Sequence, residues 1–159
     1  MSTYLVVADS SKARIMQLTH GLFPALEPVE TLECPSARLA KHEMQSDRGA
    51  TVFARAGHAG PGSPQSARSS TGSDHDPHVV QMDRFAKSIA GKLDLARQQG
   101  HAHRFLLVAG PHFLGVLRKH LSDPTRHLVT GELDRDLIHS PDTQIVETLR
   151  REGLLAPAA

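Results

Sequence analysis

The stretch from residue 104 to residue 121 restricts most strongly the folds that this chain can adopt. It begins with Phe105 to Ala109, a short uninterrupted apolar run that is typical of a strand covered on both faces. Gly110 and Pro111 end this run, and Pro111 suits the first position of a helix, where its missing N–H is not needed. An apolar stripe at helical spacing follows, formed by Phe113, Leu114, Leu117 and Leu121. A covered strand that turns into an amphipathic helix is half of a βαβ unit, so the sequence predicts a sheet flanked by helices.

Antiparallel strands are predicted at the start of the chain. Tyr4 to Ala8 are apolar and predict a buried strand, and Asp9 to Lys12 have the polar side chains of a turn. Ala13 to Leu18 alternate enough to predict a second strand, so that the two strands form a hairpin. We expect residues 21–28 to be a loop and Val29 to Leu32 to be a third, shorter strand.

The second half of the chain alternates helices with strands. The longest helix is predicted over residues 77–99, with Gly100 at its end. Two strand-like segments follow the stretch described above, at residues 127–130 and 132–137, and a final helix is predicted over residues 140–153. This order of elements predicts an α/β protein with a mixed sheet of about five strands and flanking helices.

The composition suits one globular domain, which we place at residues 1–155. The net charge of the 159 residues is +1, so no overall field marks a nucleic-acid or membrane-surface protein. Cys34 is alone, which excludes an internal disulfide and a thiolate zinc cluster. The start of the chain lacks a signal-peptide pattern, and no apolar run approaches the length of a membrane span. We therefore expect a cytoplasmic protein without a membrane span.

A long loop rich in glycine, serine and proline is predicted at about residues 45–76. Its two large apolar residues, Val52 and Phe53, bury too little surface to offset the entropy of ordering the segment. We therefore expect most of it to be mobile, and a loop of this length in a compact domain is either functional or disordered.

Acidic residues near strand ends are the first candidates for chemistry. Asp9 ends the first predicted strand, and Glu132, Asp134 and Asp136 lie in or after the last one. If those strands are neighbours, Asp9 and Asp134 could hold Mg²⁺ for phosphodiester hydrolysis. Asp9 is equally explained as a turn former, and the acids around Asp134 as surface charge. The eleven histidines lack the spacing of a helical zinc site, so we predict no metal and no cofactor.

Basic residues are the second group of candidates. A solvated surface is the usual meaning of such residues, but cations that converge beside a mobile loop would suit a phosphate backbone. The candidate binding residues are Lys12, Arg14, Arg48, Arg55, Arg118 and Lys119.

Several stretches together resemble the host-attachment protein family, bacterial proteins named as required for attachment to host cells. The matching segments span nearly the whole chain in the expected order, and they are residues 5–15, 46–49, 83–87, 105–121 and 132–137. The family is similar in fold to the middle domain of archaeal and eukaryotic peptide-chain release factors and of Pelota. The resemblance therefore implies a ribonuclease H-like α/β unit with a mixed five-stranded sheet.

The resemblance also implies a role near RNA or the ribosome. The Gly-Gly-Gln loop with which release factors trigger peptide release is absent here, so we do not expect that activity. The leading hypothesis is a non-enzymatic module that binds RNA or a ribosomal partner. The alternatives are a divalent-metal nuclease that uses Asp9 and Asp134, and a protein-interaction factor whose 45–76 loop binds a protein partner and indirectly supports attachment.

Overall fold

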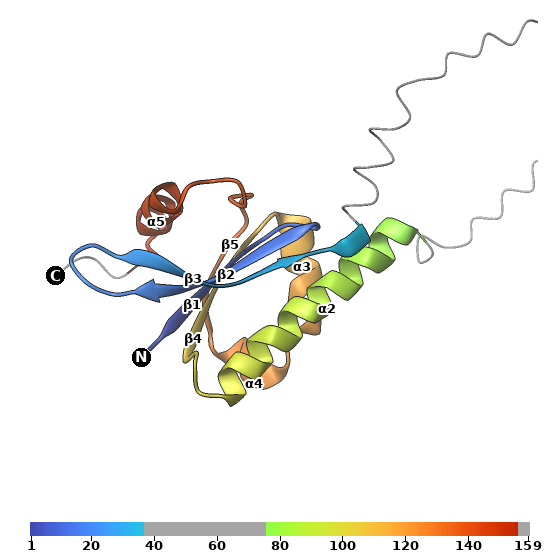
Figure 1. Cartoon of the computed structure of the whole chain (residues 1–159), viewed down its shortest axis with the longest axis horizontal. Coiled ribbons are helices and arrows are strands. Elements are labelled where there is room, and N and C mark those ends of the chain that lie inside the picture. Colours follow the sequence, from blue (N-terminus) through green and yellow to red (C-terminus); the bar gives the residue numbers. More distant parts are fainter. Residues whose placement is uncertain (37–75, 156–159) are drawn as a thin grey trace, which may run out of the picture.

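A mixed five-stranded sheet forms the centre of the protein in a computed structural model, which describes residues 1–36 and 76–155 (Figure 1). The elements are β1 (Thr3–Ala8), β2 (Lys12–Thr19), β3 (Ala25–Glu33), α2 (Pro77–Gln98), β4 (Arg104–Ala109), α3 (Pro111–His120), α4 (Asp123–His127), β5 (Val129–Leu133) and α5 (Asp142–Arg151). The strands are ordered β3-β2-β1-β4-β5. The pairs β1–β2 and β2–β3 are antiparallel, whereas β1–β4 and β4–β5 are parallel. The predicted α/β class is confirmed. The ribonuclease H-like detail stays a prediction.

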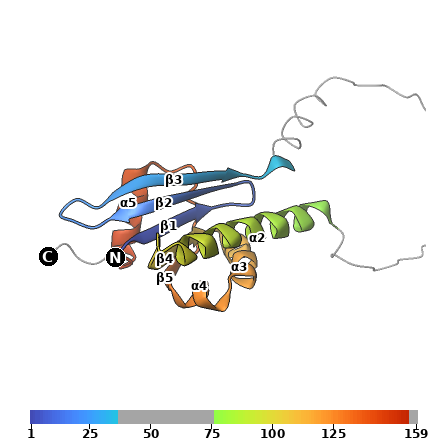
Figure 2. The ribbon, with the colours of Figure 1, turned by 60° about the horizontal axis from the view of Figure 1, so that its bottom comes forward.

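Helices cover both faces of this sheet, with α2, α3 and α4 on one side and α5 on the other (Figure 2). Side chains alternate along β1, so that Val6 joins the core under α2 and α3 while Val7 joins the core under α5. All six residues of β1 and all but the first of β4 are buried. Their continuous apolar sequences follow from this burial on both faces.

The long helix begins and ends where the sequence predicts, and the last helix ends where it predicts. The Asp76 carboxylate accepts a hydrogen bond from the N–H of His78 at the start of α2. Gly100 and Gly153 follow α2 and α5 with φ of 70° and 72°, a left-handed conformation that favours glycine. Their N–H groups bond back to carbonyls of the last helical turn, which satisfies groups that a helix end leaves free.

The third strand is longer than predicted, because it spans Ala25–Glu33 and not only residues 29–32. Its glutamates and Pro28 suggest a loop, but β3 is an edge strand, where proline and charge are tolerated. Ile15 pairs with Glu30 and Met16 with Pro28, so Val29 is an extra residue, a β-bulge. The bulge reverses the alternation, and Leu26 therefore faces α5 while Leu32 faces α2.

The segment after α3 also differs from the prediction. Residues 123–127 form α4, and the Ser122 side chain caps this helix by accepting a hydrogen bond from the N–H of Thr125. The prediction of strands at residues 127–130 and 132–137 was wrong in its bounds. The single strand β5 crosses Gly131, whereas residues after Leu133 leave the sheet. The predicted loop at 45–76 lies outside the described residues, apart from Asp76. Within the described ranges, the helices are too short or too polar to cross a membrane.

Candidate functional site

Asp9, the first candidate residue of the alternative nuclease hypothesis, builds the turn between β1 and β2. Its Oδ1 accepts hydrogen bonds from the Ser11 N–H at 2.8 Å, the Ser11 hydroxyl at 2.9 Å and the Lys12 N–H at 2.7 Å. An aspartate that accepts from the backbone two and three residues ahead is a turn former. The geometry therefore accounts for Asp9 without a reaction.

Asp134 lies at the same edge of the sheet as Asp9 but not on a neighbouring strand. Both follow the carboxyl ends of parallel strands, and β4 lies between β1 and β5. Two strand spacings amount to about 10 Å. The condition for the nuclease hypothesis, that the two strands are neighbours, is not met. In residues 1–36 and 76–155, no three His, Cys, Asp or Glu side chains are placed to hold one metal ion.

The two predicted binding arginines that the structure describes lie on opposite faces of the sheet. Arg14 on β2 forms an ion pair with Asp142 of α5, and its Nη1 donates to the Ser140 carbonyl at 3.3 Å. Arg118 on α3 donates through Nε to Glu132 of β5 at 2.7 Å and forms a second hydrogen bond through Nη2. This hydrogen bonding raises the pKa of Arg118 further above its ordinary value. Both guanidinium groups therefore connect a helix to the sheet.

The remaining predicted cations do not complete a common basic surface. Lys12 begins β2, two residues before Arg14, and alternation places both on the face of α5. Lys119 is exposed in the last turn of α3, next to Arg118. Arg48 and Arg55 lie outside the described residues. The four described cations thus form two pairs on different elements and different faces.

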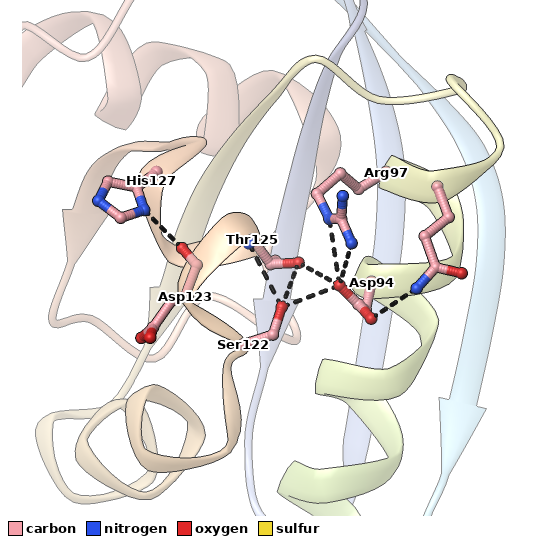
Figure 3. A network of polar contacts seen from close by, with 7 residues as sticks. Asp94, Arg97, Ser122, Asp123, Thr125 and His127 are labelled. Atoms are coloured by element: carbon pink, nitrogen blue, oxygen red, sulfur yellow. Dashed lines mark hydrogen bonds and ion pairs between the residues drawn. The ribbon is translucent and has the colours of Figure 1, made fainter.

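A polar network around Asp94 connects α2 to α4, and sequence reasoning missed it (Figure 3). Asp94 Oδ1 accepts from the hydroxyls of Ser122 and Thr125, each at 2.9 Å, and from Arg97 Nη2 at 2.9 Å. Its Oδ2 accepts from the amide of Gln98 at 2.9 Å. The hydrogen bonds from Ser122, Thr125 and Arg97 lower the pKa of Asp94 to about 2.

This network has a structural task. It joins α2 to the start of α4, and the Thr125 side chain within it is completely buried. Both Asp94 oxygens have donors from the protein itself, so the carboxylate is held as an anion by fixed groups. The Ser-Asp-Pro sequence at 122–124, a helix start, was the signal available for it.

A groove between the β2–β3 hairpin and α5 is the largest hollow among those described, with a volume of about 730 Å³. Its apolar part comes from Pro24, Leu26 and Val146, and charged side chains of α5 lie around it. The lining residues are Pro24, Ala25, Leu26, Asp142, Thr143, Val146, Glu147, Arg150 and Arg151. The hairpin tip beside it carries Leu22 and Phe23, which are 69% and 85% exposed. Sequence reasoning placed a loop here, and the apolar pair within that loop was the signal it overlooked.

A smaller hollow of about 520 Å³ lies between the end of β3 and the first half of α2. Cys34 is buried at its wall, and its Sγ lies 3.2 Å from the hydroxyl of Ser36. A serine hydroxyl is not a general base for a thiol, so this contact fits a packed cysteine better than a nucleophile.

The comparisons with known proteins identify a family. A solved structure titled "Archaeal protein" is 7% identical; the match covers 96% of this chain and 39% of that one, with a TM-score of 0.42. This chain thus spans about two fifths of that protein, and a likeness this weak does not bear on the predicted relation to release factors. No curated protein sequence matches the chain. The family model described as "Protein required for attachment to host cells" matches residues 4–149. Because that match covers most of its length, the chain belongs to this host-attachment family.

Proposed function

We propose that this member of the host-attachment family is a non-enzymatic cytoplasmic module that binds a protein partner and supports attachment through that contact. The observation that carries the proposal is the pair Leu22 and Phe23, two large apolar side chains exposed together at the tip of a hairpin. Single exposed apolar residues are ordinary, but two adjacent large apolar side chains, one of them aromatic, exposed beside a groove are typical of a protein-binding surface.

The carboxylates and arginines named above have structural tasks, which leaves the exposed apolar pair as the better-supported site. Asp9 forms a turn, Asp94 joins two helices, and the two arginines on opposite faces are held by carboxylates. Each is therefore explained by the fold. RNA or ribosome binding stays a prediction that rests on Lys12, on Lys119 and on the cations outside the described residues. The nuclease hypothesis stays a rival without converging acids.

Photo-crosslinking in cells that encode the protein tests the proposal. A crosslinking amino acid replaces Phe23 in the full chain, and a matched chain carries it at Leu95, an apolar residue of α2 that is 47% exposed. We expect a discrete protein adduct from position 23 that is absent from position 95. The adduct should disappear when Thr143→Lys is added, because that side chain would fill the groove.

The same experiment separates the rival functions. Equal labelling from both positions would contradict the proposed surface. Adducts to RNA, together with co-sedimentation with ribosomes that falls steeply with salt, would support the RNA hypothesis instead. A Mg²⁺-dependent nuclease activity that Asp9→Ala abolishes would establish the enzyme.

A further inference from the structure

We infer that the hairpin tip and the groove bind a second copy of the same chain, giving a two-fold dimer in which Leu22 and Phe23 of each chain enter the groove of the other. The inference rests on the proposed function, because it names the partner of the same surface. It also goes beyond it, because protein binding could involve an unrelated partner.

The surface is self-complementary, which is the requirement for a two-fold interface. Such an interface uses one patch on both subunits, so the patch must contain both the projecting and the receiving part. Here the projecting pair, Leu22 and Phe23, directly precedes Pro24, the first residue of the groove lining. The projecting pair therefore borders the groove, whose other wall comes from α5.

Arg150 adds a chemical reason for an aromatic occupant. Its neighbours on the groove are neutralised, since Arg151 lies 3.1 Å from Glu147 and Asp142 pairs with Arg14. Arg150 is exposed and, within the part of the chain that the structure describes, its side chain forms no ion pair. A guanidinium free of carboxylates attracts the face of an aromatic ring, and Phe23 supplies an exposed ring.

The contact area is enough for a weak dimer. The exposed parts of Leu22 and Phe23 amount to roughly 250 Å² in each chain, by the area that such side chains bury. With an equal area of groove covered in each chain, the dimer would bury about 1,000 Å² in total, the lower limit for a specific interface. We therefore expect dimerisation that depends on protein concentration.

The edge of β3 makes the rival mode, strand addition across the dimer, unfavourable. Pro28 removes one backbone donor from this edge, and the extra residue Val29 bends the strand. Glu27 and Glu30 would bring like charges together in a pair of β3 strands. Two copies should therefore meet through the hairpin tip and not by extending the sheet.

Sedimentation of the purified full chain over a concentration series tests the inference. We expect a monomer–dimer equilibrium in the wild type and a dissociation constant about a hundredfold higher in Phe23→Ala, since each of the two contacts loses about tenfold. Leu95→Ser is the matched control and should leave the equilibrium unchanged. Circular dichroism checks that each variant is folded.

Mixing two defective chains gives the sharper result. Thr143→Lys blocks the groove but keeps Phe23, whereas Phe23→Ala keeps the groove. Each variant alone should be monomeric where the wild type is dimeric. Their mixture should associate more strongly than either, because the heterodimer keeps one intact contact. Absence of this recovery, with both chains folded, would overturn the two-fold arrangement.

Two further outcomes would overturn the inference without touching the proposed function. One is a wild-type chain that stays monomeric at hundreds of micromolar, while the crosslinking amino acid at position 23 captures a different protein in cells. The other is Phe23-dependent binding of the monomer to vesicles of phosphatidylcholine and phosphatidylglycerol, which would assign the tip to a membrane surface.

Discussion

Gly131 is the residue whose missing side chain decides how closely the end of the chain approaches the sheet. A Cβ atom placed there would lie 2.6 Å from Leu154 Cδ2 and 3.0 Å from Leu106 Cδ2. Leu106 is buried in the sheet, and Leu154 packs against the same core after α5. The sequence shows a glycine between strand-like residues, and only the packing explains why it is there.

Gly131→Ala is expected to lower the free energy of unfolding by about 1 kcal/mol, the low end for overpacking, because the added methyl group meets the ends of two leucine side chains and the partly buried Leu154 can move. Urea unfolding measures the change. Gly91→Ala is the matched control. Gly91 lies inside α2, and a Cβ atom added there would have no neighbour within 4 Å, so alanine should stabilise the protein by about 0.5–1 kcal/mol. A destabilised control, or an unaffected Gly131→Ala, would contradict this account.

At the scale of elements, α2 and α4 are held together by charge and hydroxyl groups. Asp94 of α2 accepts from Ser122 and Thr125 at the start of α4, a helix of five residues that could not persist alone. The α2 amphipathic pattern was readable from the sequence, but its polar partner lies 28 residues away along the chain. This distance is why the network could not be predicted from the sequence, although Ser-Asp-Pro at 122–124 marked the helix start.

Asp94→Asn is expected to destabilise the protein in a pH-dependent way. The folded protein lowers the pKa of Asp94 from 3.8 to about 2, so the ionised carboxylate stabilises the fold above its unfolded pKa. That contribution is present above about pH 5 and is lost as the pH falls toward about 2. Thermal unfolding across this range should show the gap between wild type and variant narrowing in acid.

The control for this prediction is Asp123→Asn, on the exposed side of the same short helix. Its side chain is 84% exposed and lies 3.6 Å from Arg126, a surface pair that contributes little. The wild type and this variant should unfold almost alike at every pH. A gap between wild type and Asp94→Asn that stayed constant down to about pH 2 would show that the charge of Asp94 is not what stabilises the fold.

At the scale of the whole molecule, the sheet separates two cores. The helices α2 and α3 lie on one side of it and α5 on the other (Figure 2). Each side has its own apolar core, and β1 contributes side chains to both. Arg14 and Arg118 each fasten a helix to the sheet, but on opposite sides. The charged residues proposed as one basic surface therefore serve two separate layers.

The substitutions Arg14→Gln and Arg118→Gln are expected to act independently. Each removes a partly exposed ion pair, so each should lower the free energy of unfolding by less than about 1 kcal/mol. Because the pairs share no partner, the double variant should equal the sum within about 0.5 kcal/mol. Chemical denaturation of the four proteins measures the coupling, and a coupling well above that value would contradict the two-layer account.

The sequence by itself determined the local structure and the class of the fold. The apolar runs of β1 and β4, the proline and glycine boundaries of α2 and α5, and the helical stripes all depend on neighbouring residues, so they could be predicted. The extent of β3 could not, because an edge strand tolerates a proline and glutamates that resemble a loop.

Only the tertiary structure decided which charged residues meet. Strand order placed β4 between Asp9 and Asp134, and the two faces of the sheet separated Arg14 from Arg118. The same folding brought Asp94 to Ser122 and set the hairpin tip beside α5 to form the groove. Contacts between distant segments depend on topology and packing, which residue spacing along the chain does not contain.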